Sequence, residues 1–311
     1  MWMTELPPFV PFFIAAFMAI LARGWLRALI VLDTPVLGGL HLWFDVAPGI
    51  ITSVSVLEYD LILMRTDRLS LLFGYLFHIA AFIAALFALH VRDTTQTVSS
   101  LLYAGSALGA VFAGDLITLF IFWELLAVSS VFLIWARHTE RAIRSGMRYL
   151  IIQVSSGLLL LAGALVQYYQ SGSLEFNYIG LEGISGWLIF FAFGIKCAFP
   201  LLHNWLTDAY PEATPTGTVF LSAFTTKVAI YALARGYPGT ELLVYIGAVM
   251  TIFPIFYAVI ENDLRRVLAY SLINQLGFMV CGIGVGTALA LNGTVAHAFS
   301  HVIYKALLFM S

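Results

Sequence analysis

The sequence predicts an all-α integral membrane protein, a polytopic bundle of about eleven transmembrane helices. Three observations support this fold class. Hydrophobic residues make up 61% of the 311 residues and charged residues only 10%. Mean hydropathy is +0.95, far outside the range of soluble domains. Apolar segments recur along the whole chain, and most approach the roughly 20 residues that a helix needs to cross a bilayer.

The expected helices follow one another with short connections. Taken in order, they cover residues 8–21, 28–41, 69–89, 98–112, 116–135, 149–169, 187–206, 218–234, 242–260, 264–283 and 288–310. The first two and the fourth are short or weakly apolar. Between the second and third, residues 42–67 predict a small β-hairpin, because apolar and polar residues alternate there in two sets. The alternating residues are Thr52, Val54 and Val56, then Tyr59, Leu61 and Leu63.

The arginines predict the orientation of the chain. One set of alternate connections carries nine of them: Arg23, Arg27, Arg92, Arg137, Arg141, Arg144, Arg148, Arg265 and Arg266. The opposite set carries Arg65, Arg68 and Arg235. Because short cytoplasmic loops gather positive charge, we expect the N-terminus outside the cytoplasm and the hairpin on the periplasmic side.

All three lysines of the chain lie inside apolar segments, at positions Lys196, Lys227 and Lys305. An ionisable group in hydrocarbon costs about 2.5–3.5 kcal/mol on insertion scales, so it persists where it faces a bundle interior, a partner charge or water. Lysine can also release its proton when buried, whereas arginine practically cannot. This pattern favours a protein that moves protons or cations.

Pro200 follows Lys196 by four residues and is expected to break the seventh helix. Proline has no N–H, so the carbonyl of Lys196 loses its helical partner. In transporters, broken helices at membrane depth mark the ion or substrate site. The alternative is a routine proline kink, with the lysine reaching toward one membrane surface.

Glu124 is interpreted as the only carboxylate deep in an apolar segment. A buried carboxylate requires a counter-charge or protonation, and an intramembrane lysine is the natural partner. We therefore expect Glu124 and Lys196 to form a coupled pair, with a static structural pair as the alternative. Lys227 lies one segment further on and would pass a proton onward, or serve a structural role.

His297, His301 and Lys305 are spaced four residues apart, so they share one helical stripe. Histidine titrates near neutral pH and relays protons through both ring nitrogens, so a proton wire is the favoured interpretation. The alternatives are a metal site, for which no carboxylate or thiol completes the ligand set, and helix packing through polar side chains.

No motif indicates a cofactor, a resident metal or a catalytic centre. Cys197 and Cys281 lie in apolar segments and form no CxxC pair. There is no dinucleotide fingerprint, no haem or iron–sulfur ligand set, and no nucleophile with a base. No basic run suits nucleic acid. We therefore expect a chain that is not itself an enzyme, and any redox chemistry would belong to partner subunits.

Five stretches together resemble a known family. They are Phe122-Trp123-Glu124-Leu125, Gly194 to Leu206, Thr226 to Tyr231, Asp263 to Ser271 and His297 to Phe309. In this order they resemble the antiporter-like membrane subunits shared by Mrp-type multisubunit Na+/H+ antiporters, respiratory complex I and membrane-bound hydrogenases. The Thr-Lys-Val of the eighth helix and the preceding Tyr-Pro pair resemble the D-type subunit of Mrp antiporters in particular.

The resemblance implies a fold of about fourteen helices with two inverted five-helix repeats, each containing a broken helix. On this chain it implies helices 1–3 with the hairpin in residues 1–94, the first repeat in 95–237 and the start of the second in 238–311. The second broken helix would lie beyond Ser311, so we expect these 311 residues to be a truncated piece of a longer protein.

The resemblance also implies roles for single residues. Glu124 corresponds to the fifth-helix glutamate, Lys196 to the lysine of the broken seventh helix and Lys227 to the connecting lysine. His297, His301 and Lys305 correspond to the eleventh-helix relay. In the loop after the seventh helix the family usually has proline and histidine where this chain has Thr207 and Tyr210, which leaves the geometry of that loop open.

The leading hypothesis is a subunit that translocates protons or sodium in the bacterial inner (cell) membrane, together with partner subunits. One alternative is a proton-pumping subunit of an NADH:quinone oxidoreductase or membrane-bound hydrogenase. A second is a non-conducting scaffold. An enzyme acting on membrane lipid is a third class, against which the absence of a reactive serine, metal set or paired catalytic carboxylates counts.

Overall fold

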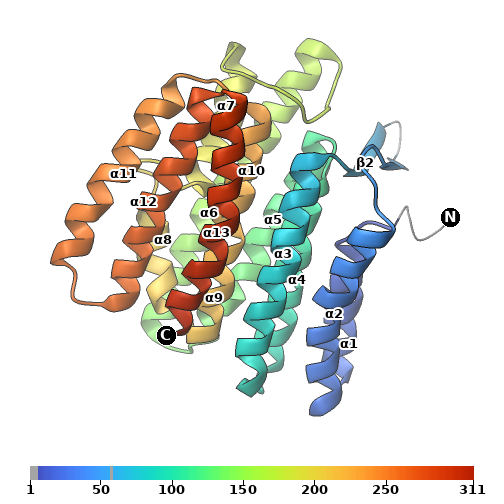
Figure 1. The fold of residues 1–311 in the computed structure, drawn as a ribbon, viewed down its shortest axis with the longest axis vertical. Coiled ribbons are helices and arrows are strands. Elements are labelled where there is room, and N and C mark those ends of the chain that lie inside the picture. Colours follow the sequence, from blue (N-terminus) through green and yellow to red (C-terminus); the bar gives the residue numbers. More distant parts are fainter. Residues whose placement is uncertain (1–5, 57–58) are drawn as a thin grey trace.

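Helices form nearly the whole of the computed structural model, which describes residues 6–56 and 59–311. The elements in chain order are α1 (Val10–Leu21), α2 (Trp25–Phe44), β1 (Ile51–Val56), β2 (Tyr59–Arg65), α3 (Arg68–Phe87), η1 (Ala88–His90), α4 (Thr94–Phe112), α5 (Leu116–Trp135), α6 (Glu140–Ser171), α7 (Gly183–Lys196), α8 (Asn204–Ala209), η2 (Tyr210–Glu212), α9 (Pro215–Ala223), α10 (Thr225–Gly236), α11 (Leu242–Ile260), α12 (Leu264–Val285) and α13 (Ala288–Met310). In Figure 1, α1 and α2 stand at one edge of the bundle and α11 at the opposite edge.

Within the described residues, 7 helical stretches are long and apolar enough to cross a membrane. They are α2, α3 with η1, α5, α6, α9 with α10, α11 and α12. The chain is therefore a membrane-embedded, polytopic helical protein. The four other expected segments correspond to α1, α4, α7 and α13. Of these, α1 and α7 are shorter apolar helices, while α4 and α13 carry many hydroxyl, amide or histidine side chains.

A two-stranded antiparallel hairpin, β1 with β2, lies at one end of the bundle (Figure 1). It packs on the connection between α4 and α5, because the N–H of Ile62 donates to the Asp115 carboxylate at 2.6 Å. The N–H of Gly114 donates to the Ile62 carbonyl at 3.0 Å. Asp115 also caps α5 through the Thr118 N–H, so one carboxylate fixes both the helix start and the hairpin.

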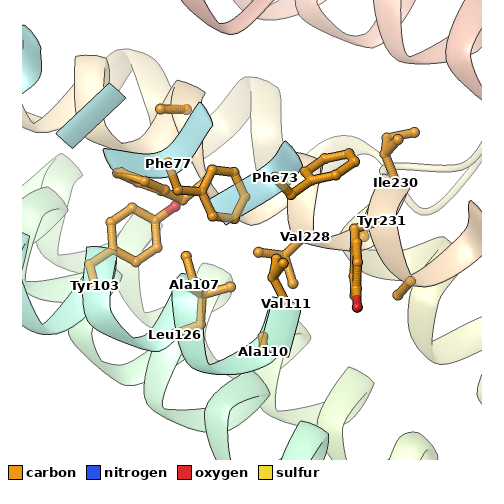
Figure 2. Close-up of a cluster of buried hydrophobic side chains, with 14 of the residues drawn as sticks. Phe73, Phe77, Tyr103, Ala107, Ala110, Val111, Leu126, Val228, Ile230 and Tyr231 are labelled. Atoms are coloured by element: carbon orange, nitrogen blue, oxygen red, sulfur yellow. The ribbon is translucent and has the colours of Figure 1, made fainter. Parts of the chain in front are cut away.

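The core is centred on the stretch formed by α9 and α10, in which 18 consecutive residues are all buried. Figure 2 shows aromatic and aliphatic side chains of α3, α4 and α10 meeting there. Phe73 of α3 packs edge-on against Tyr231 of α10 at 5.5 Å between ring centroids. Phe77 of α3 and Tyr103 of α4 both contact Phe224, at 5.2 and 5.3 Å. This packing holds α9 and α10 in the interior of the bundle.

The start of α3 is tied to the end of α10. The Asp67 carboxylate accepts the N–H of Ser70, and the Ser70 hydroxyl accepts the N–H of Asp67, which is a capping box. The same carboxylate pairs with Arg235 of α10 at 2.6 Å. One acidic residue therefore joins two helices that are distant in the sequence.

Candidate functional site

The helix that carries Lys196 is interrupted directly after this residue. α7 ends at Lys196, α8 begins at Asn204, and Pro200 lies in the gap. Ala198 and Leu201 adopt positive φ values of 62° and 68°, a conformation that costs non-glycine residues about 1–3 kcal/mol and clusters at functional sites. The backbone of the interruption is therefore strained at these two residues.

A side chain from beyond the gap bonds the last turn of α7. The indole N–H of Trp205 in α8 donates to the carbonyl of Ile195 at 2.8 Å, and the same carbonyl accepts the N–H of Ala198 at 3.1 Å. The Trp205 bond therefore ties α8 to the end of α7.

The Lys196 ammonium points toward α5. Its side chain is fully buried, and Nζ donates to the Trp123 carbonyl at 2.8 Å. Nζ also lies 4.7 Å from the centroid of the Trp123 ring, within cation–π range. Ser156 of α6 holds that indole, since its hydroxyl accepts the indole N–H at 2.9 Å and donates to the Ala192 carbonyl at 2.7 Å. Three helices thus fix the position of the Lys196 charge.

Glu124 follows Trp123 on α5 and is partly buried. Its Oε1 is buried and makes no hydrogen bond within the described protein. The carboxylate lies against Gly157 of α6, where an added Cβ would overlap Oε1. Among the described residues no ion pair joins Glu124 to Lys196, although the two are close enough for their charges to interact. The lysine bonds a backbone carbonyl instead.

Lys227 lies at a second helix interruption, between α9 and α10. α9 ends at Ala223 and α10 begins at Thr225. The fully buried Lys227 ammonium donates to the Ser222 carbonyl at 2.6 Å and lies 3.3 Å from the Thr226 hydroxyl. The Lys227 ammonium therefore replaces the backbone N–H that would bond the Ser222 carbonyl in an unbroken helix.

Buried tyrosines form hydrogen bonds with the residues around the interruption between α9 and α10. The Tyr103 hydroxyl of α4 accepts the N–H of Thr225 at 3.0 Å and shares a 2.6 Å bond with the Thr225 hydroxyl. The Tyr210 hydroxyl donates to the Leu221 carbonyl at 2.8 Å. Sequence reasoning did not find this network, because no proline or glycine marks residues 222–226. The available signal was a cluster of hydroxyl residues, Ser222, Thr225 and Thr226, beside a buried lysine.

The predicted stripe of α13 faces the interior at two of its three positions. His301 and Lys305 are buried, and His297 is partly buried. The rings of His297 and His301 stack with centroids 6.0 Å apart. Neither ring nitrogen of His301 nor Nζ of Lys305 has a hydrogen-bond partner within the described protein. These buried polar atoms require water or a mobile partner.

The pathway residues form two groups. Glu124 and Lys196 lie between α5, α6 and α7, while Lys227 lies close enough to His301 and Lys305 for their charges to interact. Cys197, the residue after Lys196, is also within electrostatic range of Lys227. The structure therefore brings the predicted ionisable residues together as two groups in the interior of the bundle.

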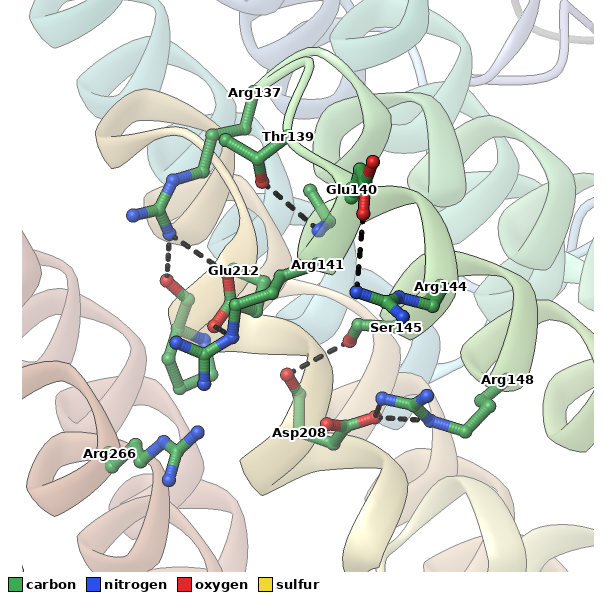
Figure 3. Close-up of polar contacts among 12 residues, drawn as sticks. Arg137, Thr139, Glu140, Arg141, Arg144, Ser145, Arg148, Asp208, Glu212 and Arg266 are labelled. Atoms are coloured by element: carbon green, nitrogen blue, oxygen red, sulfur yellow. Dashed lines mark hydrogen bonds and ion pairs between the residues drawn. The ribbon is translucent and has the colours of Figure 1, made fainter.

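A surface charge cluster fixes the segment after the interruption of α7 (Figure 3). Arg148 of α6 donates two hydrogen bonds to the Asp208 carboxylate, from Nε at 2.9 Å and from Nη2 at 2.7 Å. The Ser145 hydroxyl donates to the Asp208 carbonyl at 2.9 Å. Glu212 pairs with Arg137 and Arg141 at 3.4 and 3.5 Å. The loop that carries Thr207 and Tyr210 is therefore held as a short helix against α6.

A second carboxylate lies inside an apolar helix, so the prediction that Glu124 is the only one was wrong. Asp33 occupies the ninth position of the 20-residue helix α2, and it is exposed on the outer surface of that helix. Its neighbours Leu29, Leu37 and Leu40 are exposed as well. Arg27, Asp33 and His41 together lower the mean hydropathy of α2 to 1.2.

In the part of the chain that the structure describes, no group of three or more His, Cys, Asp or Glu side chains could hold a metal ion.

Comparison with known proteins gives a family and several relatives. The family model "NADH:quinone oxidoreductase/Mrp antiporter, TM" matches residues 113–311. The chain is 27% identical to the D-type subunit of the Na(+)/H(+) antiporter of Alkalihalophilus pseudofirmus, over 98% of the chain and 68% of that protein. It is 33% identical to NADH-quinone oxidoreductase subunit N of Desulforudis audaxviator, over 67% of the chain and 46% of that protein. A solved Mrp complex from Dietzia sp. DQ12-45-1b superposes with a TM-score of 0.86 and 26% identity, over 97% of this chain and 36% of that one.

Proposed function

The chain belongs to the NADH:quinone oxidoreductase/Mrp antiporter membrane family, and on this premise we propose that it is a proton- or monovalent-cation-translocating subunit of a multisubunit membrane complex. Within that family we propose that it is the D-type subunit of an Mrp Na+/H+ antiporter. The similarity to such a subunit over 98% of the chain supports this assignment. The chain spans 68% of that relative, so the activity of the whole protein is part of the proposal.

One observation carries the proposal: the only three lysines of the chain are all buried in the helical bundle. Lys196 and Lys227 lie at two helix interruptions, and Lys305 lies on the α13 stripe. A buried lysine can exist with or without its proton, and each change of charge acts on the next group. Glu124, Lys196, Lys227, His297, His301 and Lys305 would pass protons along this route.

The unpartnered atoms of the route support a hydrated path. Glu124 Oε1, both nitrogens of His301 and Lys305 Nζ lack partners within the described residues, whereas Lys196 and Lys227 hold backbone carbonyls. Water would bridge the unpartnered groups, since buried water satisfies polar atoms of this kind. Pro200 would keep α7 open beside Lys196, so that the lysine can reorient between Trp123 and Glu124.

The remaining architecture belongs to the proposal as well. Residues 95–237 would form one five-helix repeat and 238–311 the beginning of an inverted second one, after helices 1–3 in residues 1–94. The arginine-rich connections would face the cytoplasm of a bacterial cell, with the N-terminus and the hairpin outside. The partners would be other membrane subunits.

A proton-pumping subunit of a redox complex is the second candidate. The 33% identity to subunit N of an NADH-quinone oxidoreductase favours it. In that case the same ionisable route would work, but electron transfer in partner subunits would drive it instead of a sodium gradient.

Proton movement in inverted membrane vesicles tests the proposal. The vesicles hold the chain together with the products of its neighbouring genes, and a pH-sensitive dye reports proton movement. Movement driven by added sodium supports the antiporter. Movement seen only with NADH or another electron donor supports the redox subunit. Assembly of the complex without movement under either condition contradicts both and leaves a scaffold.

A further inference from the structure

A cavity of about 710 Å³ opens beside the α1–α2 hairpin, away from the lysine route. Its walls come from α2, the end of α3, the start of α4 and the start of α9. Ligand pockets commonly enclose roughly 300–1,000 Å³, so this volume suits a small molecule or a lipid headgroup.

The cavity is strongly basic. Arg23, Arg27 and Arg92 line it, and no carboxylate does. In the described chain none of the three forms an ion pair. Arg27 is held by backbone only, since Nε donates to the Ala22 carbonyl at 3.0 Å and Nη1 to the Arg92 carbonyl at 3.4 Å. The neighbouring Asp93 is engaged with the N–H of Thr95 and the amide of Gln96. Three guanidinium charges therefore stand uncompensated around one space.

The walls of the cavity change from polar to apolar. Trp25, 75% exposed, stands among the arginines, and tryptophan at a helix end marks the level of lipid headgroups. Val31, Ala85 and Phe220 line the same cavity and are buried. A ligand with a negative head and an apolar tail matches this gradient better than a small anion alone.

We propose that this cavity binds a phosphate group, supplied by an anionic phospholipid whose acyl chain lies along the apolar wall. Arginine recognises phosphate through paired N–H donors. Basic pockets between transmembrane helices bind anionic headgroups. The lipid would hold the α1–α2 hairpin to α3, α4 and α9, because its phosphate would bridge arginines from the start of α2 and from the connection before α4.

Native mass spectrometry of the detergent-solubilised complex that contains the chain tests this site. The probes are dioleoyl-phosphatidylglycerol and dioleoyl-phosphatidylcholine, which differ in net headgroup charge but not in acyl chains. The unmodified chain should retain phosphatidylglycerol in preference to phosphatidylcholine. The triple variant Arg23→Gln, Arg27→Gln, Arg92→Gln should lose that preference, by about fivefold for each arginine removed. The control Arg141→Gln, Arg144→Gln, Arg266→Gln removes the same charge outside the cavity and should keep it.

A single-arginine variant and a competition with inorganic phosphate complete the test. Arg23→Gln alone changes an exposed side chain and should lower the preference about fivefold without affecting folding. Inorganic phosphate that binds alone and displaces phosphatidylglycerol would identify free phosphate as the ligand. An unchanged preference in the cavity variants, or an equal loss in the control, would overturn the site.

Discussion

The Lys227 ammonium donates a 2.6 Å hydrogen bond to the carbonyl oxygen of Ser222, across the interruption between α9 and α10. The same group is close enough to Lys305 for their charges to interact. One lysine therefore stabilises a broken helix and takes part in the proposed route. A change in its charge or position would alter both.

Replacing Lys227 by methionine should lower the free energy of unfolding by about 1–3 kcal/mol, because the buried Ser222 carbonyl loses its donor. Lys305→Met is the matched control, since Lys305 Nζ has no hydrogen bond to lose within the described residues. Both variants should still assemble and both should transport less. Thermal unfolding in detergent, followed by tryptophan fluorescence, gives the comparison. A larger loss for Lys305→Met would contradict the assigned role of the Ser222 bond.

Gly157→Ala should impair transport while leaving stability nearly unchanged. A Cβ at this position would overlap Oε1 of Glu124, at the end of a flexible side chain that can move aside. Displacing a group whose geometry matters can cost about a hundredfold in rate. Gly293→Ala, on α13 with open space around it, is the control. Equal proton movement in the two variants would show that the position of Glu124 is unimportant.

The chain should lose stability in acid through Asp67. Burial raises the pKa of this carboxyl, but the Arg235 guanidinium and the Ser70 N–H outweigh burial and bring the pKa below its usual range. A lowered folded-state pKa adds stability that is present above the unfolded value, about 3.9, and is lost as pH falls through the folded value.

Asp67→Asn tests this assignment in a thermal unfolding series from neutral to acidic pH. The variant should be less stable at pH 7, and its stability should fall less on acidification than that of the unmodified chain. Asp263→Asn, which alters the cap of α12, controls for capping alone. Identical acid sensitivity of the chain and Asp67→Asn would exclude the Asp67–Arg235 pair as the cause.

Arg148→Ala should loosen the helix after the interruption of α7. Its two bonds to Asp208 are short, but the side chain is 57% exposed, so the expected loss is about 0.2–1 kcal/mol. Arg144→Ala, which removes a 3.5 Å pair within α6, should cost less. Molar salt should reduce the difference through screening. A difference that survives molar salt would point to packing instead of charge.

Apolar length, motifs and alternation predicted much of the architecture. The membrane class, the family and the hairpin strands followed from local patterns, and Pro200 indicated a gap that opens directly after Lys196. The break at Phe224 could not be predicted, because it depends on Tyr103 and Tyr210 from other segments. Burial of single ionisable groups also depends on packing. Asp33 lies on an outer surface, while Lys196 bonds the Trp123 carbonyl and not Glu124.

Lys196 is proposed to carry protons through the complex by gaining and releasing one. Arginine at this position would keep a charged donor toward the Trp123 carbonyl but could not release its proton, whereas methionine would remove the charge.

Sodium-driven proton movement in vesicles that hold the assembled complex, compared for the unmodified chain, Lys196→Arg and Lys196→Met, is the most direct test. Assembly is checked in the same membranes by co-purification of the subunits. We expect both variants to assemble and both to lose proton movement. Intact movement in Lys196→Met, or in Lys196→Arg, would contradict it.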